Sequence, residues 1–138
     1  MTALPQRLVL TVSGLVIVLV GAAGTFAPVW FREAGGVPMP SDAGLLSETR
    51  AAGALVLAAG VFLIIGGLVP RHARPAAAVG AVVYLVTAVS RLLSLAVDGS
   101  PGSGLLFAAA VESALGLACA ALLMTRRSAP VPTRRLPT

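Results

Sequence analysis

Two charged residues, Arg91 and Glu112, lie inside long apolar stretches of the sequence. A charge at the centre of a membrane-spanning helix costs about 2.5 to 3.5 kcal/mol on insertion scales, so each residue needs a partner or a function. Arg91 precedes Asp98 by seven residues and Glu112 follows Ser103 by nine, which places them about 10 and 13 Å from the same end of two antiparallel helices. An arginine and a carboxylate at matched depth predict a bidentate ion pair.

Further polar residues share the face of the stretch that holds Arg91. Positions i, i+4, i+7 and i+11 lie on one side of a helix, and here they are Thr87, Arg91, Ser94 and Asp98. Two more charges, Glu48 and Arg50, stand at the start of the apolar stretch that precedes the one with Arg91, on the same predicted side of the membrane. We therefore predict a polar pocket whose candidate catalytic residues are Glu112, Asp98 and Arg91, and whose candidate binding residues are Glu48, Arg50, Thr87 and Ser94.

Simpler structural roles compete with this pocket. The pair Arg91 and Glu112 could serve only to fix the register of two helices, or could belong to a contact between subunits of a homo-oligomer. Charges at the ends of membrane spans, such as Glu48, Arg50 and Asp98, are normally just solvated. The glycines at positions 53, 60 and 67, spaced every seven residues, predict a helix-packing seam.

Three classes of function fit a polar cluster in an apolar protein. The first is a noncatalytic protein that binds a lipophilic small molecule or serves as an accessory membrane subunit. The second is a membrane-embedded enzyme, such as an isomerase, a cyclase or an epoxide hydrolase, in which Glu112 or Asp98 is the general acid or base and Arg91 stabilises developing negative charge. The third is a small proton-coupled transporter that uses Glu112. Small multidrug transporters carry their essential glutamate in the first helix, where this sequence has no charge.

The composition indicates an integral membrane protein. Hydrophobic residues make up 57% of the 138 residues and charged residues 11%, against about 25% charged residues in an average soluble domain. The ten basic residues are all arginines, and all but Arg91 lie outside the apolar stretches or at their ends, so we expect contact with the lipid membrane and no nucleic-acid binding. Cys119 and His72 are single residues of their kinds and predict neither a disulfide nor a metal site. No phosphate-binding glycine loop with lysine and no G-x-S-x-G motif is present, and we expect no cofactor.

Apolar stretches of about 20 residues predict four transmembrane helices. The expected class is an all-α, integral membrane four-helix bundle that forms one domain over residues 1–125. Ser41 or Asp42 is the candidate N-cap of the second helix, and Pro70 is expected to end it. The predicted spans are residues 8–26, 45–69, 76–97 and 103–125.

The distribution of arginines predicts the orientation. With four spans, the side that holds both termini carries seven arginines, and the other side carries Arg32 and Arg50. The positive-inside rule then places both termini in the cytoplasm and the protein in the cell (inner) membrane. The polar cluster is accordingly expected in the outer half. Residues 126–138, with four arginines and three prolines, predict a disordered basic cytoplasmic tail.

The first apolar stretch has two interpretations, a retained transmembrane helix or a secretory signal peptide. Residues 1–7 resemble the n-region of a secretory signal peptide, and Ala22 and Ala23, near the end of the apolar stretch, are small, as a cleavage site requires. The apolar stretch is longer than the usual h-region of about 7 to 15 residues, which favours a retained helix. Trp30 lies where an interfacial aromatic anchor is expected.

Short motifs resemble those of a family of small bacterial four-helix membrane proteins known as domain of unknown function 4345. They are an acidic-x-Arg start of the second helix, an Arg-x-x-Ser segment that ends in Asp-Gly, and a glutamate in the fourth helix. The matching residues are Glu48-Thr49-Arg50-Ala51-Ala52-Gly53, Ser90-Arg91-Leu92-Leu93-Ser94-Leu95-Ala96-Val97-Asp98-Gly99 and Glu112. Ala52 stands where the family often has an aromatic residue. The resemblance implies the fold and topology, and no activity.

Overall fold

Four long helices make up most of the protein in the computed structural model, which describes residues 3–38, 40 and 42–125. They are α1 (Ala3–Phe26), α3 (Ala43–Leu68), α4 (Ala73–Asp98) and α5 (Ser103–Thr125), joined by the short helix α2 (Pro28–Ala34) and a 3₁₀ turn (Pro70–His72). No strand occurs among the described residues. Each long helix is long and apolar enough to cross a membrane. The chain is therefore an all-α, multi-pass membrane protein, as predicted.

Two helix boundaries differ from the predicted spans. Helix α1 begins five residues before position 8, at Ala3, and α4 begins at Ala73 instead of at position 76. The predicted bounds followed the apolar residues, whereas the helical hydrogen bonds continue past Arg7 and Arg74 into the zone where charged side chains reach water. The other spans agree within two residues. The predicted tail at 126–138 lies outside the described residues.

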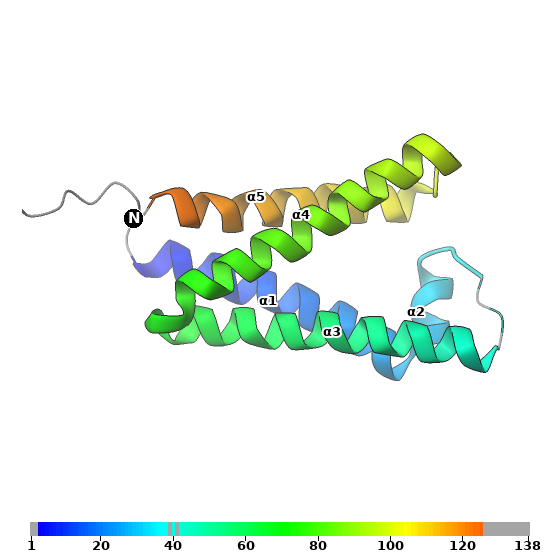
Figure 1. Cartoon of the computed structure of the whole chain (residues 1–138), viewed down its shortest axis with the longest axis horizontal. Helices are drawn as coiled ribbons and strands as arrows, with labels where there is room; N and C mark the ends of the chain where they lie inside the picture. The colour runs from blue at the N-terminus through cyan, green and yellow to red at the C-terminus, as the bar shows by residue number, and fades with distance from the viewer. Residues whose placement is uncertain (1–2, 39, 41, 126–138) are drawn as a thin grey trace, which may run out of the picture.

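The helices form two antiparallel pairs, α1 with α3 and α4 with α5 (Figure 1). The start of α1 and the end of α5 lie at the same end of the bundle, which we call the terminal end. Helix α2 lies at the opposite end, which we call the α2 end (Figure 1). Helix α4 crosses from α3 at the terminal end toward the start of α5 at the α2 end.

Glycines allow α1 and α3 to pack closely. Gly53, Gly60 and Gly67 of α3 face α1, and Gly14 and Gly21 of α1 face α3. A Cβ atom on Gly60 would lie 2.7 Å from a backbone nitrogen of α1, closer than real Cβ contacts allow. Because lipid supplies no hydrophobic drive between helices, such close van der Waals contact is a main source of association. The predicted packing seam on α3 is confirmed, and α1 supplies its other half.

Polar contacts link α1 to the second pair of helices. The Tyr84 hydroxyl of α4 donates a hydrogen bond to the Ser13 backbone carbonyl of α1 at 2.7 Å. The Cys119 thiol of α5 lies 3.8 Å from the Ser13 hydroxyl. All three residues are buried. These contacts stabilise the middle of the bundle.

The helices begin and end at residue types that are typical of helix termini. The Asp42 carboxylate accepts a hydrogen bond from the Leu45 amide at 2.8 Å and caps α3, as predicted, while Ser41 lies outside the described residues. Pro70 follows the end of α3. Gly99 and Gly102, with φ of 89° and 95°, form the turn between α4 and α5, a conformation that glycine adopts without steric cost. This short turn holds α4 and α5 in register.

Candidate functional site

The Arg91–Glu112 ion pair joins α4 to α5 in the half of the bundle nearer α2. Arg91 Nε lies 2.7 Å from Glu112 Oε2, and Arg91 Nη2 lies 3.0 Å from Glu112 Oε1. This is the bidentate geometry expected from the matched depths. The Arg91 side chain is 31% exposed and that of Glu112 is 17% exposed. The pair is thus partly open to its surroundings, although it neutralises both charges.

A cavity adjoins this ion pair between the two helix pairs. Its volume is about 320 Å³, and residues of all five helices line it. The walls are apolar except for Thr87, Tyr84 and the ion pair. Its lining consists of Val16, Ile17, Val20, Phe31, Val56, Val83, Tyr84, Thr87, Arg91, Phe107, Ala108, Val111 and Glu112. A cavity of this size, with apolar walls and few polar groups, is the usual form of a small-molecule site.

A second cavity of about 500 Å³ continues toward α2. It shares with the first cavity the residues Val20, Phe31, Arg91, Ala108 and Glu112. Its remaining lining comes from α2, the turn after it and the start of α5, namely Trp30, Arg32, Ala34, Gly35, Val37, Gly104 and Leu105. We call the two together the interhelical cavity. The ion pair lies at the junction of its two parts.

Helix α2 brings a third charged residue, Arg32, to the interhelical cavity. Pro28 begins the helix with its fixed backbone angle, and the amides of Gly35 and Val37 end it by donating to the Arg32 carbonyl at 3.1 and 2.9 Å. The Arg32 Nε atom is buried and has no hydrogen-bond partner within the part of the chain that the structure describes. The sequence did not indicate this position, because Arg32 was counted there only among the charges that predict the orientation.

The predicted stripe on α4 divides between cavity and surface. Thr87 lines the interhelical cavity and donates to the Val83 carbonyl at 2.8 Å. Ser94 is exposed, and its hydroxyl donates to the Asp98 carboxylate at 2.8 Å. Together with Thr87 and Arg91 it lines a separate cavity of about 310 Å³. Asp98 is also exposed and is absent from the lining of the interhelical cavity. The structure therefore does not bring Asp98 together with Glu112.

The two charges at the start of α3 lie away from the ion pair. Glu48 and Arg50 are exposed, and neither lines the interhelical cavity. Glu48 lines a neighbouring cavity of about 390 Å³ between α1, α2 and α3, which Arg32 also lines. The glycine seam fixes the rotation of α3 about its axis, and this rotation decides where Glu48 and Arg50 point.

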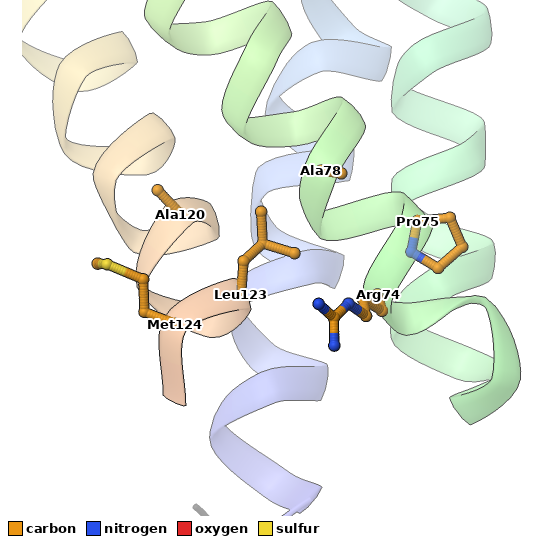
Figure 2. A pocket seen from close by; sticks show the side chains of 6 residues that line it. All are labelled: Arg74, Pro75, Ala78, Ala120, Leu123 and Met124. Atoms are coloured by element: carbon orange, nitrogen blue, oxygen red, sulfur yellow. The ribbon is translucent and has the colours of Figure 1, made fainter. Parts of the chain in front are cut away.

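A groove between α4 and α5 at the terminal end is chemically simpler. Figure 2 shows its lining, in which Arg74 at the start of α4 extends its guanidinium toward Leu123 of α5. Arg74 is the one charged residue of its lining, and no carboxylate joins it there. This composition is typical of a lipid-facing groove beside an interfacial arginine. The interhelical cavity therefore remains the candidate site.

The site's chemistry rests on carboxylate and guanidinium groups. Across residues 3–38, 40 and 42–125, no three histidine, cysteine, aspartate or glutamate side chains gather to form a metal site. Glu112 is the carboxylate of the interhelical cavity, and both of its oxygens contact Arg91. Such a site can bind a polar group of a ligand next to an apolar wall.

Comparison with known proteins gives the family. No curated protein and no solved structure matches this chain. A family model, described as domain of unknown function (DUF4345), matches residues 5–123. This match covers the four long helices except for the first two residues of α1 and the last two of α5, and it includes the ion pair and the lining of the interhelical cavity. The chain belongs to the DUF4345 family.

Proposed function

We propose that this protein binds a lipophilic small molecule within the membrane, in the interhelical cavity. One observation carries the proposal: a partly accessible Arg91–Glu112 ion pair lies at the junction of two apolar-walled cavities. An ion pair needed only for helix register has no need of a cavity beside it. A ligand with an apolar body and one polar end matches the distribution of polar and apolar residues.

Binding is preferred over acid–base catalysis because of where the carboxylates lie. Two carboxylates in one cavity would favour an isomerase or a cyclase. Asp98 is instead exposed at the end of α4, and both oxygens of Glu112 contact Arg91. The roles of Glu112, Asp98 and Arg91 in catalysis, of Glu112 in proton-coupled transport, and of the protein as an accessory or homo-oligomeric subunit remain predictions.

The orientation is part of the proposal. We infer that both termini are cytoplasmic and that the protein resides in the cell (inner) membrane, from the excess of arginines beside the terminal end. The start of α1 and the end of α5 lie at this end (Figure 1). The interhelical cavity then lies in the outer half of the membrane. A ligand would reach it from the outer leaflet or from the outer surface.

Photolabelling tests the proposal. The full chain in phosphatidylcholine vesicles is labelled with a diazirine-bearing octadecanol, and the modified peptides are identified by mass spectrometry. The variant Ala108→Leu fills the junction of the cavity, which Ala108 lines in both parts. The matched control Ala110→Leu makes the same change on the same helix at an exposed position.

We expect label on the cavity-lining segments of α4 and α5, a several-fold loss in Ala108→Leu, and no loss in Ala110→Leu. Circular dichroism and size-exclusion chromatography check that both variants fold. Equal labelling of the two folded variants, or label confined to lipid-facing residues, would contradict the proposal.

A further inference from the structure

We propose that the ligand of the interhelical cavity carries an oxyanion, a carboxylate or a phosphate, and that Arg32 binds it. This inference rests on the proposed function, because the oxyanion is the polar end of the lipophilic molecule. Arg32 belongs to α2, at the end of the cavity where such a polar group would lie. The ligand class is therefore a single-chain anionic amphiphile.

The charge balance of the cavity is the first argument. Three charged residues line it, Arg32, Arg91 and Glu112. Arg91 and Glu112 neutralise each other in a bidentate contact. Arg32 therefore leaves one unmatched positive charge in the lining. Arg32 is half-buried, so its unmatched charge is partly withdrawn from water, and a bound counter-ion would lower the cost of that withdrawal.

The unsatisfied hydrogen-bonding group of Arg32 is the second argument. Its Nε atom is buried without a hydrogen-bond partner in the described part of the chain. Buried polar atoms are nearly always partnered in folded proteins, so a missing partner needs an explanation. A guanidinium presents parallel N–H groups in a planar fork that matches the oxygens of a carboxylate or a phosphate. A bound oxyanion would supply the missing acceptor.

The local backbone holds Arg32 in this position. The two amide hydrogen bonds to its carbonyl close the turn after α2, and the preceding residue, Phe31, lines both parts of the cavity. Arg32 and Phe31 thus present a cation and an aromatic ring to the same space. From Arg32 the apolar lining continues past Val20 and Ile17 to Tyr84. An alkyl chain fits this gradient from charged to apolar.

Glu48 is the competing partner of Arg32. Both residues line the neighbouring cavity between α1, α2 and α3. The ion pair present among the described residues, at a limit of 4.0 Å, is Arg91–Glu112 and does not include Arg32. Glu48 is also exposed. A structural Arg32–Glu48 pair would make Glu48→Gln and Arg32→Gln behave alike, and this distinguishes it from ligand binding.

The experiment compares three diazirine probes with the same alkyl chain: octadecanoic acid, octadecyl phosphate and octadecanol. The full chain in phosphatidylcholine vesicles is labelled at a pH where both acids are ionised. The variants are Arg32→Gln, Arg32→Lys and Glu48→Gln. Arg50→Gln is the matched control, because it removes an exposed arginine from the same end of the bundle.

We expect the wild type to prefer one anionic probe over octadecanol by about tenfold, the worth of a charge-assisted hydrogen bond. Arg32→Gln should lose this preference while it keeps the octadecanol label. Arg32→Lys should keep part of the preference, and Arg50→Gln and Glu48→Gln should keep all of it. The preferred anion distinguishes a carboxylate ligand from a phosphate ligand.

Two results overturn the inference. One is an unchanged preference in folded Arg32→Gln, and the other is equal labelling of the wild type by all three probes. If either result is obtained while the probes still label the cavity and Ala108→Leu reduces that label, only the role of Arg32 is contradicted, and the binding of a lipophilic molecule stands. If no probe gives label that Ala108→Leu reduces, the proposed function fails as well. Should Arg32→Gln fail to fold, Arg32→Lys decides the test: a partial loss of the preference supports the inference, and the full wild-type preference overturns it.

Discussion

At the scale of single residues, the Arg91–Glu112 contact shows how two costly charges become compatible with a membrane. Each side chain satisfies the other through two hydrogen bonds. The energetic consequence is asymmetric, because removal of one partner leaves the other charge unpaired in an apolar environment. Replacement of both by apolar residues removes the desolvation cost and the attraction together.

We expect Glu112→Gln and Arg91→Ala each to destabilise the protein by about 3 kcal/mol. This value is the lower end of the range for breaking a buried ion pair, because Arg91 is partly exposed. The double variant Arg91→Leu/Glu112→Leu should recover most of this loss. Thermal denaturation of the detergent-purified proteins, followed by circular dichroism, measures the differences. A double variant less stable than either single variant would show that the pair supports the fold in some further way.

The ion pair was predictable from sequence because it depends only on depth along two helices joined by a short turn. Counting from Asp98 and from Ser103 was enough. Arg32 was not predictable in the same way, because α2 has only seven residues and its position depends on how α1 and α3 pack. Glu48 and Arg50 lie at the α2 end of the bundle, but both are exposed and neither lines the interhelical cavity.

At the scale of helices, the α1–α3 contact depends on the absence of side chains at the glycine seam. Prediction succeeded for the α3 half of this seam because the spacing of seven residues is visible in the sequence. The partner helix was not visible, since several pairings of four helices satisfy the same spacing. The structure assigns α1 as that partner.

We expect Gly60→Ala to destabilise the protein by about 1 to 3 kcal/mol, because the new Cβ would force α1 and α3 apart. Gly104→Ala is the matched control, since a Cβ at Gly104 in α5 meets nothing within 4 Å. It should be neutral or slightly stabilising, as alanine favours helix. Thermal denaturation in detergent compares them. Equal effects of the two changes would mean that the seam is not a close contact in the membrane.

At the scale of the whole molecule, four spans bring the start of α1 and the end of α5 to one end of the bundle (Figure 1). The arginine distribution then predicts which side of the membrane this end faces. Hydropathy made the number of spans predictable, because each helix has a window of mean hydropathy of 1.9 or more. The interhelical cavity was not predictable from hydropathy, because it depends on the path of α4 from α3 at the terminal end to the start of α5 at the α2 end.

We expect a green fluorescent protein fused after Thr125 to fluoresce and an alkaline phosphatase fused there to be inactive. A fusion after Gly99, in the turn at the α2 end, should give the opposite result. Green fluorescent protein fluoresces only when it folds on the cytoplasmic side, and alkaline phosphatase is active only on the opposite side, so the two readouts identify the side of each fusion point. The reverse pattern at both positions would invert the orientation and place the interhelical cavity in the inner half.

The short turn between α4 and α5 has a consequence for biosynthesis. Arg91 and Glu112 belong to helices that follow each other in the chain, with only residues 99–102 between them. Their charges can therefore pair as soon as α5 has been synthesised, without waiting for α1 and α3 to arrive. Membrane insertion of the second helix pair as a preformed hairpin avoids exposing either charge alone to lipid. Residues that border the cavity in the finished protein would thus also lower the cost of inserting α4 and α5 into the bilayer.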